Sequence, residues 1–330
     1  MTVPPAPRAP ARAPLAGIAC AMGASLMFSF NDVIFKWLSG DYPLHQMVLI
    51  RAGIGLSVML LVIVPMNGGW GMLRTGKWRL HLIRAAFVVA SNLFYFLAIA
   101  SLPLADAVAV FFVAPLLVTA LSVPLLGERV GPRRWIAVLV GLLGVIVMVR
   151  PGSAAFQPAA LLSIAAALAY ALMHVMTRRM GGTESALTMT AYVQGSFLVV
   201  SLLMGLAVGD GRFAGSADPA LAFLFRAWAW PAPADWGLMG VIGLTSTLGG
   251  ILIAQAYKLA EAGLVAPFEY VSMPMAIVWG VAVFGTWPDA LAWAGIALIC
   301  GAGLYVAGRE ARLAQAERRV RRDAAAGGDL

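Results

Sequence analysis

Long apolar runs dominate this chain and leave it one possible solvent, the lipid bilayer. Ten segments are rich in apolar residues and bounded by Gly, Pro or charge: 15–37, 44–66, 80–101, 107–127, 132–149, 159–179, 186–208, 235–257, 263–285 and 289–307. A helix needs roughly 20 apolar residues to cross the hydrocarbon layer. The composition agrees, since 61% of the residues are hydrophobic, 12% are charged and the mean hydropathy is +0.87. We therefore predict an all-α membrane protein with ten transmembrane helices.

Basic residues are divided unequally between the two sides of these segments. Four lie on one side: Lys36, Arg150, Arg212 and Arg226. Arg51 lies within a helix, and the other 18 of the 23 Lys and Arg residues lie on the side of the termini. Because cytoplasmic loops accumulate Lys and Arg, the N-terminal tail 1–14 and the basic tail 309–330 are predicted to be cytoplasmic. Topology thus explains the net charge of +8 without nucleic acid, and binding of anionic lipid headgroups is a second interpretation of the C-terminal tail.

The longest connection, 209–234, falls on the outer side in this topology. It is rich in Ala, Pro and Trp. Trp228, Trp230 and Trp236 suit a short segment at the level of the lipid headgroups, where indole rings are favoured. A variable outer loop is the alternative interpretation.

The two halves of the chain carry matching positions. The run Phe111 to Pro115 aligns with Tyr270 to Pro274 at a numbering offset of 159. Four further pairs share offsets of 158 or 142: Gly127 with Gly285, Trp135 with Trp293, Val33 with Val175, and Lys36 with Arg178. We predict two five-helix repeats, 15–150 and 151–308. Because five is odd, the second repeat is inverted, an arrangement typical of transporters that alternate access to a site near the bilayer midplane.

Two tracts resemble a known family. The stretch Ile99-Ala-Ser-Leu-Pro-Leu-Ala-Asp-Ala-Val-Ala-Val-Phe-Phe-Val-Ala-Pro-Leu-Leu, continuing to Leu126-Gly127-Glu128-Arg129-Val130, resembles the end of the first EamA domain of the drug/metabolite transporter superfamily. Val265-Ala-Pro-Phe-Glu-Tyr270 resembles the matching part of the second domain. One departure is Gly285-Thr286, where the family usually has an acidic residue after the glycine, so the second inter-helix contact is expected to be weaker or differently satisfied.

The resemblance implies a multi-pass transporter of the bacterial inner membrane that works without ATP. The first tract is most similar to family members associated with S-adenosylmethionine uptake and riboflavin uptake. The family also contains amino-acid and metabolite exporters, so export remains the alternative. An integral-membrane enzyme would need clustered His, Asp or Glu near one interface, and a channel would need rings of like side chains around a pore; neither pattern is present in the sequence.

Charged residues within the apolar segments are candidates for the substrate path, because each is costly to bury in lipid. Asp32 and Arg51 lie at similar depths on consecutive helices and are predicted to meet, either as part of the substrate path and outer gate or as a structural ion pair. Glu269 either binds a cationic group or a proton, or packs the halves as a neutral acid. His174, at the repeat position of Asp32, is either a packing residue or a proton carrier.

The remaining candidates are aromatic and amide side chains, which suit an apolar small-molecule site with few polar groups. They are Asn92, Tyr95, Phe111, Phe112, Tyr170, Gln194, Gln255 and Tyr270. Ordinary membrane core is the alternative interpretation of each. The three histidines are too scattered for a metal site, and no motif indicates a cofactor. The expected partners are a small-molecule substrate and membrane lipids, and the oligomeric state is left open.

Overall fold

The computed structural model describes residues 13–66, 68–127, 131–153, 156–180, 184–259 and 268–326 of the 330-residue chain. Within these ranges every regular element is a helix and no strand is present, so the all-α prediction is confirmed. The segment 1–12, Glu128 to Val130, and Val265 to Pro267 of the second tract lie outside the described residues.

The helices of the first half coincide with the predicted apolar segments. They are α1 (Ala13–Leu38), α2 (Leu44–Val58), α3 (Val64–Met66), α4 (Trp78–Ser101), α5 (Leu104–Phe111), α6 (Ala114–Leu126) and α7 (Pro132–Val149). A π-helical turn, Met59–Ile63, joins α2 to α3, and a 3₁₀ turn, Trp70–Leu73, precedes α4.

The helices of the second half also fall on predicted apolar segments, except for α10. Its helices are α8 (Ala160–Met180), α9 (Ala186–Val208), α10 (Pro219–Phe225), α11 (Pro233–Leu259), α13 (Ser272–Phe284) and α14 (Ala290–Ala326). The short helix α10 lies in the 209–234 connection. α14 continues far beyond its predicted end at 307, through most of the basic tail.

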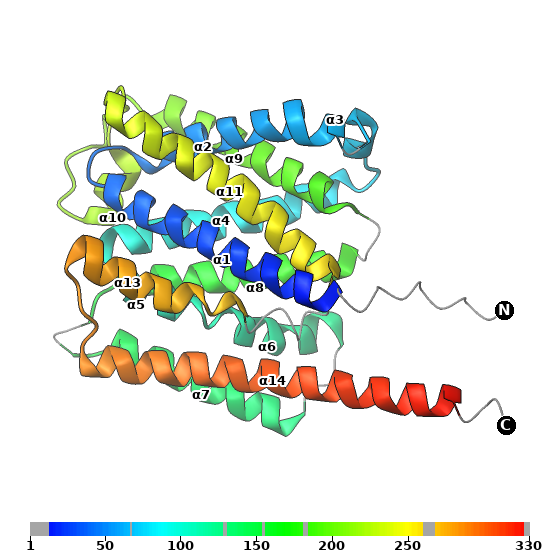
Figure 1. The fold of residues 1–330 in the computed structure, drawn as a ribbon. Helices are drawn as coiled ribbons and strands as arrows, with labels where there is room; N and C mark the ends of the chain where they lie inside the picture. Colours follow the sequence, from blue (N-terminus) through cyan, green and yellow to red (C-terminus); the bar gives the residue numbers. More distant parts are fainter. Residues whose placement is uncertain are drawn as a thin grey trace.

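The helices form a bundle whose long elements run between two ends (Figure 1). One end carries α10 and is termed the α10 end. Both termini leave the opposite side, which is termed the terminal end, and the last turns of α14 project from it.

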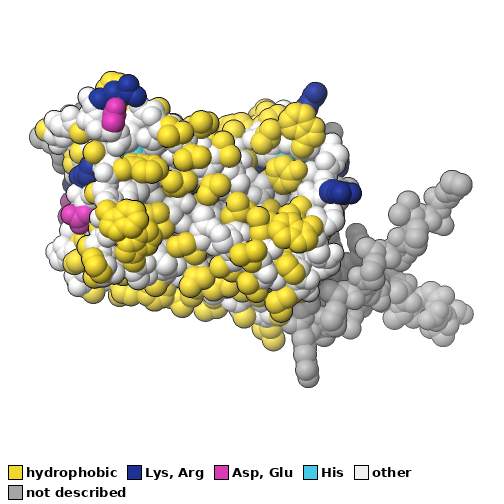
Figure 2. Space-filling view, turned by 90° about the horizontal axis from the view of Figure 1, so that it is seen from above, with side chains coloured by type: hydrophobic (Ala, Val, Ile, Leu, Met, Phe, Trp, Pro, Cys, Tyr) yellow, Lys and Arg dark blue, Asp and Glu magenta, His cyan; other side chains and the backbone are white. Residues whose placement is uncertain are grey.

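Seven helical stretches among the described residues are long and apolar enough to cross a membrane: Leu15–Leu38, Leu44–Met66, Trp78–Ser101, Leu104–Leu125, Ala160–Thr177, Leu187–Val208 and Pro233–Ile253. Three shorter apolar helices occupy the other predicted segments: Trp135–Val149, Ser272–Phe284 and Ala290–Val306. The count of ten crossing helices therefore stays a prediction. Figure 2 shows apolar side chains across the middle of one face, with the visible charged side chains toward the two ends.

The tryptophans mark both ends of the bundle. Nine of the ten are exposed: Trp37, Trp228, Trp230, Trp236, Trp287 and Trp293 toward the α10 end, and Trp70, Trp78 and Trp135 toward the terminal end. Two such belts are typical of membrane proteins, because indole rings favour the headgroup level. Trp279 is the exception, since it lies partly buried inside the bundle and donates from Nε1 to Ser29 Oγ at 2.7 Å.

The helices α6 and α13 have the same length and the same kind of C-terminal end. α6 and α13 have 13 residues each, and both end at a glycine with left-handed backbone, Gly127 (φ 70°) and Gly285 (φ 64°). Glycine adopts this conformation without a steric penalty. Thr286 donates from Oγ1 to the Gly280 carbonyl at 3.0 Å. Thr286 thus binds the last turn of its own helix α13, and the expected inter-helix contact after Gly285 stays a prediction.

α7 and α14 cross at two glycines. A Cβ added to Gly144 would lie 3.0 Å from the Gly295 carbonyl oxygen, and one added to Gly295 would lie 2.9 Å from the Gly144 carbonyl oxygen. This reciprocal contact lets the two backbones touch, as small residues do in membrane helix pairs.

We predict that Gly295→Ala lowers the melting temperature of the detergent-purified protein, measured by circular dichroism. The new Cβ would press on the Gly144 carbonyl and on Met148, and overpacking of this kind costs about 1–3 kcal/mol. Gly301→Ala on the same helix is the matched control, because no atom lies within 4 Å of its added Cβ. Equal melting temperatures for the two variants would contradict the glycine crossing.

Candidate functional site

Arg51 lies inside the bundle on α2, with 3% of its surface exposed. Its guanidinium carbon lies 5.3, 5.4 and 4.8 Å from the ring centres of Phe35, Phe96 and Phe197. Its Nη2 donates to Asn92 Oδ1 at 3.1 Å. A cation near aromatic rings recovers part of the electrostatic stabilisation that it loses on leaving water. These three rings, termed the phenylalanine box, come from α1, α4 and α9, so one charge holds both halves of the chain.

Arg51 binds Asn92 of α4, whereas Asp32 on α1 binds another residue of that helix, Tyr95. The Tyr95 hydroxyl donates to Asp32 Oδ2 at 2.8 Å. Asn92 and Tyr95 lie one helical turn apart and share a face of α4, so this helix takes the two charges separately. Asp32 and Arg51 attract each other electrostatically. Among the described ion pairs none joins them, so the predicted direct contact is wrong.

Aromatic rings continue from Tyr95 into the second half. The ring centre of Phe111 lies 4.9 Å from that of Tyr95 and 5.3 Å from that of Tyr170. Tyr170 and His174 follow in an edge-to-face contact at 4.5 Å. The structure thus joins four of the predicted site residues, Tyr95, Phe111, Tyr170 and His174, by direct ring contact between α4, α5 and α8.

The breaks before α6 and α13 bring two more predicted residues together. Phe112 and Tyr270 lie at these breaks and stack at 4.9 Å. Glu269 is partly buried and acts electrostatically on Tyr170 and Tyr270. Asp32, Arg51, Asn92, Tyr95, Phe111, Phe112, Tyr170, His174, Glu269 and Tyr270, with the phenylalanine box, are termed the central network.

Two predicted residues have other surroundings. Gln194 is buried on α9 and donates from Nε2 to Thr247 Oγ1 on α11 at 3.4 Å. Gly55 makes room for this pair, since a Cβ there would press on both side chains. Gln255 lies on an exposed part of α11. Of the predicted candidates, Gln194 therefore packs helices and Gln255 stands apart from the central network.

Sequence reasoning missed the contacts of some side chains inside the bundle. Lys36 was assigned only to an outer loop, but its Nζ donates to the carbonyls of Ile99 and Leu102 at 2.6 Å each. These carbonyls lie at the end of α4, where Pro103 offers no N–H to continue the helix. The rings of the phenylalanine box gave no sequence signal, because apolar Phe residues are common throughout the segments.

A polar contact ties the halves together at the terminal end. His81 Nε2, at the start of α4, lies 3.1 Å from Glu184 Oε2, between α8 and α9. Thr75 Oγ1 donates to Glu184 Oε1 at 3.1 Å, and the His81 ring stacks on Tyr192 at 4.6 Å. The hydrogen bond with His81 lowers the pKa of Glu184, so its carboxylate is charged at neutral pH. These contacts are termed the terminal latch.

A similar contact lies at the other end and is termed the α10 latch. The Tyr42 hydroxyl, between α1 and α2, donates to Asp235 Oδ2 in the first turn of α11 at 2.6 Å. The same hydroxyl oxygen accepts from the Ala232 N–H at 3.0 Å. The bond to Asp235 raises the pKa of Tyr42, which stays a neutral donor at physiological pH. Gln46 binds the Ala229 backbone nearby, so the 209–234 connection is packed onto the bundle.

Part of the chain is similar to a known protein family. Residues 15–150 match the EamA-like transporter family. Together with the helices long enough to span a membrane, this match indicates a multi-pass membrane protein whose residues 15–150 are similar to this transporter family. The predicted resemblance to EamA-type transporters is confirmed.

Named relatives match most of the chain. A riboflavin transporter of Vibrio cholerae is 27% identical over 93% of this chain and 98% of that protein. An S-adenosylmethionine uptake transporter of Rickettsia prowazekii is 23% identical over 84% of this chain and 87% of that protein. A pseudopaline exporter of Pseudomonas aeruginosa is 28% identical over 86% of this chain and 93% of that protein. These relatives are transporters and not enzymes, as predicted for this chain.

A solved crystal structure of a protein with no stated function aligns with a TM-score of 0.62 and 23% identity. The alignment covers 90% of this chain and 98% of the other. At this identity the likeness shows the fold alone.

We predict that double-mutant cycles will show strong coupling between Asp32 and Tyr95, which share a hydrogen bond, and weaker coupling between Asp32 and Arg51. Asp32→Asn and Tyr95→Phe break one hydrogen bond, so their coupling should reach about 1.5–3 kcal/mol, the range for hydrogen bonds to charged groups. Asp32→Asn and Arg51→Gln should couple more weakly. Thermal unfolding of the purified variants measures both. A larger coupling for Asp32 with Arg51 would restore the direct pair and refute the role of α4.

Proposed function

We propose that this chain is a secondary transporter of a bacterial inner membrane that moves a small organic metabolite by alternating access. One observation carries the proposal: polar latches join the halves at both ends of the bundle, and the central network lies on helices between them. Alternating access requires that each end open and close in turn around a fixed site. Two latches built from different residues are able to break separately.

Helix bounds support the proposed inverted repeats, 15–150 and 151–308. The combined stretch 44–66 and α9, 186–208, differ by the offset of 142 at both ends. α6 and α13 differ by the offset of 158 at both ends, beginning at 114 and 272 and ending at 126 and 284. The predicted offset of 159 for the proline-containing runs becomes 158 by these bounds, which pairs Phe112 with Tyr270.

Helix neighbours follow the pattern that a two-fold axis in the membrane plane requires. α1 packs along α11, and its proposed counterpart α8 packs along α4. α2 packs on α9 and α7 on α14, so these helices meet their own counterparts. The stack of Phe112 on Tyr270 joins two proposed counterparts in the same way. These pairings support ten crossing helices in two inverted halves.

The latches obey the same relation. Tyr42 and Glu184 differ in number by 142, the offset of the first two helices in each half. Each reaches the start of the third helix of the other half, α11 or α4. We propose that the α10 latch faces the periplasm and the terminal latch the cytoplasm, because most Lys and Arg residues lie toward the termini.

The central network favours a flat heteroaromatic substrate with a polar or charged group. Tyr95, Phe111 and Tyr170 offer ring faces and edges, and aromatic pairs of this kind stabilise stacked rings. Asp32 and Glu269 offer acceptors for hydroxyl or cationic groups. Riboflavin and S-adenosylmethionine, named for two relatives, both fit this description, and we propose uptake of such a compound. Export is the alternative, favoured by the relative named as a pseudopaline exporter.

We predict that the chain restores growth of a riboflavin-requiring bacterium at low riboflavin, and that cells expressing it take up labelled riboflavin. Labelled S-adenosylmethionine is the second substrate to test. Asp32→Asn should lower the initial uptake rate about tenfold or more, since it weakens a charge-assisted hydrogen bond in the central network.

Gln255→Ala is the matched control and should leave uptake unchanged, because Gln255 is exposed and outside the central network. Equal losses in the two variants, at equal protein levels, would refute the assignment of the site. Faster release of preloaded solute from expressing cells, without uptake, would favour the export alternative.

A further inference from the structure

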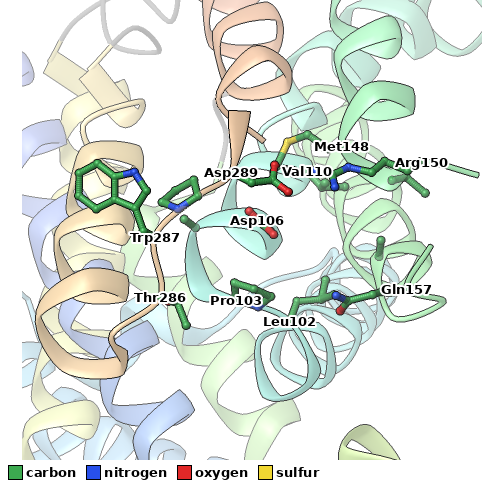
Figure 3. A pocket seen from close by; sticks show the side chains of 14 residues that line it. Leu102, Pro103, Asp106, Val110, Met148, Arg150, Gln157, Thr286, Trp287 and Asp289 are labelled. Carbon is green, nitrogen blue, oxygen red and sulfur yellow. Dashed lines mark hydrogen bonds and ion pairs between the residues drawn. The ribbon is translucent and has the colours of Figure 1, made fainter. Parts of the chain in front are cut away.

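A cavity of about 320 Å³ lies at the α10 end, apart from the central network (Figure 3). None of its lining residues belongs to that network. Its walls come from the turn between α4 and α5, the ends of α7 and α8, and the connection before α14. Its volume is at the small end of the range for ligand pockets. The cavity is therefore suited to a molecule about as large as an amino acid.

Three charged side chains face this cavity. Arg150 Nη2 and Asp289 Oδ1 form an ion pair across it, and Asp106 lies close enough to interact electrostatically with both. The bond from Arg150 lowers the pKa of Asp289, so that carboxylate is charged at neutral pH and engaged by its partner. Asp106, in the first turn of α5, is the second carboxylate of the site.

Arg150 is held in an unusual backbone conformation. It ends α7 with φ 51°, and it is the one residue other than glycine with positive φ among the described ranges. Its N–H still donates to the Ile146 carbonyl at 3.0 Å. This turn brings the side chain back over the cavity toward Asp289, as Figure 3 shows.

Two of the buried polar atoms at this cavity, of opposite character, have no hydrogen-bond partner among the described residues. They are Asp106 Oδ1, an acceptor, and Arg150 Nε, a donor. Buried polar atoms are nearly always hydrogen-bonded, so each unpaired one requires an explanation. A ligand with a cationic donor and an anionic acceptor would satisfy both atoms together.

We infer that this cavity binds a small zwitterion, with its ammonium group on Asp106 and its carboxylate on Arg150 Nε. A cation alone would leave the guanidinium N–H unpaired, and an anion alone would meet two carboxylates. Trp287 also lines the cavity. The inference concerns binding at a second site and does not depend on the transport activity proposed above.

Three probes of similar length test the charge requirement: 4-aminobutanoate, butylamine and butyrate. Binding to the full-length protein, purified in detergent, is measured by isothermal titration calorimetry. We expect 4-aminobutanoate to bind more tightly than butylamine, and butyrate to bind least. Asp106→Asn should weaken 4-aminobutanoate binding about tenfold or more, because it removes one charge-assisted contact.

Asp210→Asn is the matched control, since this exposed carboxylate lies at the same end and does not line the cavity. It should bind 4-aminobutanoate like the unaltered chain. Gel filtration and circular dichroism establish that both variants are folded. Failure of the unaltered protein to bind 4-aminobutanoate at about 10 mM, or equal affinity in Asp106→Asn, would overturn the inference. Riboflavin uptake measured in parallel is a separate result, so loss of one proposal leaves the other testable.

Discussion

The burial of one guanidinium inside an apolar bundle is the constraint on which this structure depends. Arg51 cannot be hydrated at its depth, so its charge has to be met by rings and by an amide. The rings of Phe35, Phe96 and Phe197 lie on three helices, one of them in the second half. The ring contacts that stabilise this charge therefore join the two halves of the chain at the centre of the molecule. The same helix α4 then holds Asp32 through Tyr95, which keeps two opposite charges close without a direct bond.

Around this centre, the two latches are suited to open, whereas the helix pair α7 and α14 is suited to stay fixed. Each of the two latches contains only a few hydrogen bonds near loops, so little has to be broken for either end to open. α7 and α14, in contrast, touch along their backbones at Gly144 and Gly295. Such close contact resists sliding of one helix along the other, so we infer that these two helices form a scaffold. The cavity at Asp106 lies between this scaffold and the ends of α4 and α8.

Sequence patterns predicted the helices well and their partners less well, for a physical reason. Apolar runs bounded by Gly, Pro and charge mark where helices begin and end, and the bounds of α7 and α9 agree with the predicted segments. The depth of a residue along its helix does not show how the helix is rotated about its axis, and so does not show which neighbour the side chain meets. Asp32 and Arg51 are matched in depth, yet each binds a different side chain on one face of α4. Gln255 lies outside the central network for the same reason. The phenylalanine box could not be predicted, because the sequence does not show which of the many Phe residues lie near Arg51.

The most direct test of alternating access is the reach of an impermeant maleimide to single cysteines, in a chain whose Cys20 and Cys300 are replaced by Ser. Phe111→Cys reports on the central network and Asp210→Cys on the α10 end. Alternating access predicts that residue 111 is labelled both in intact cells and in inside-out vesicles, and residue 210 in intact cells only. Labelling of residue 111 from one side alone, or of residue 210 only in inside-out vesicles, would contradict the proposed mechanism and orientation.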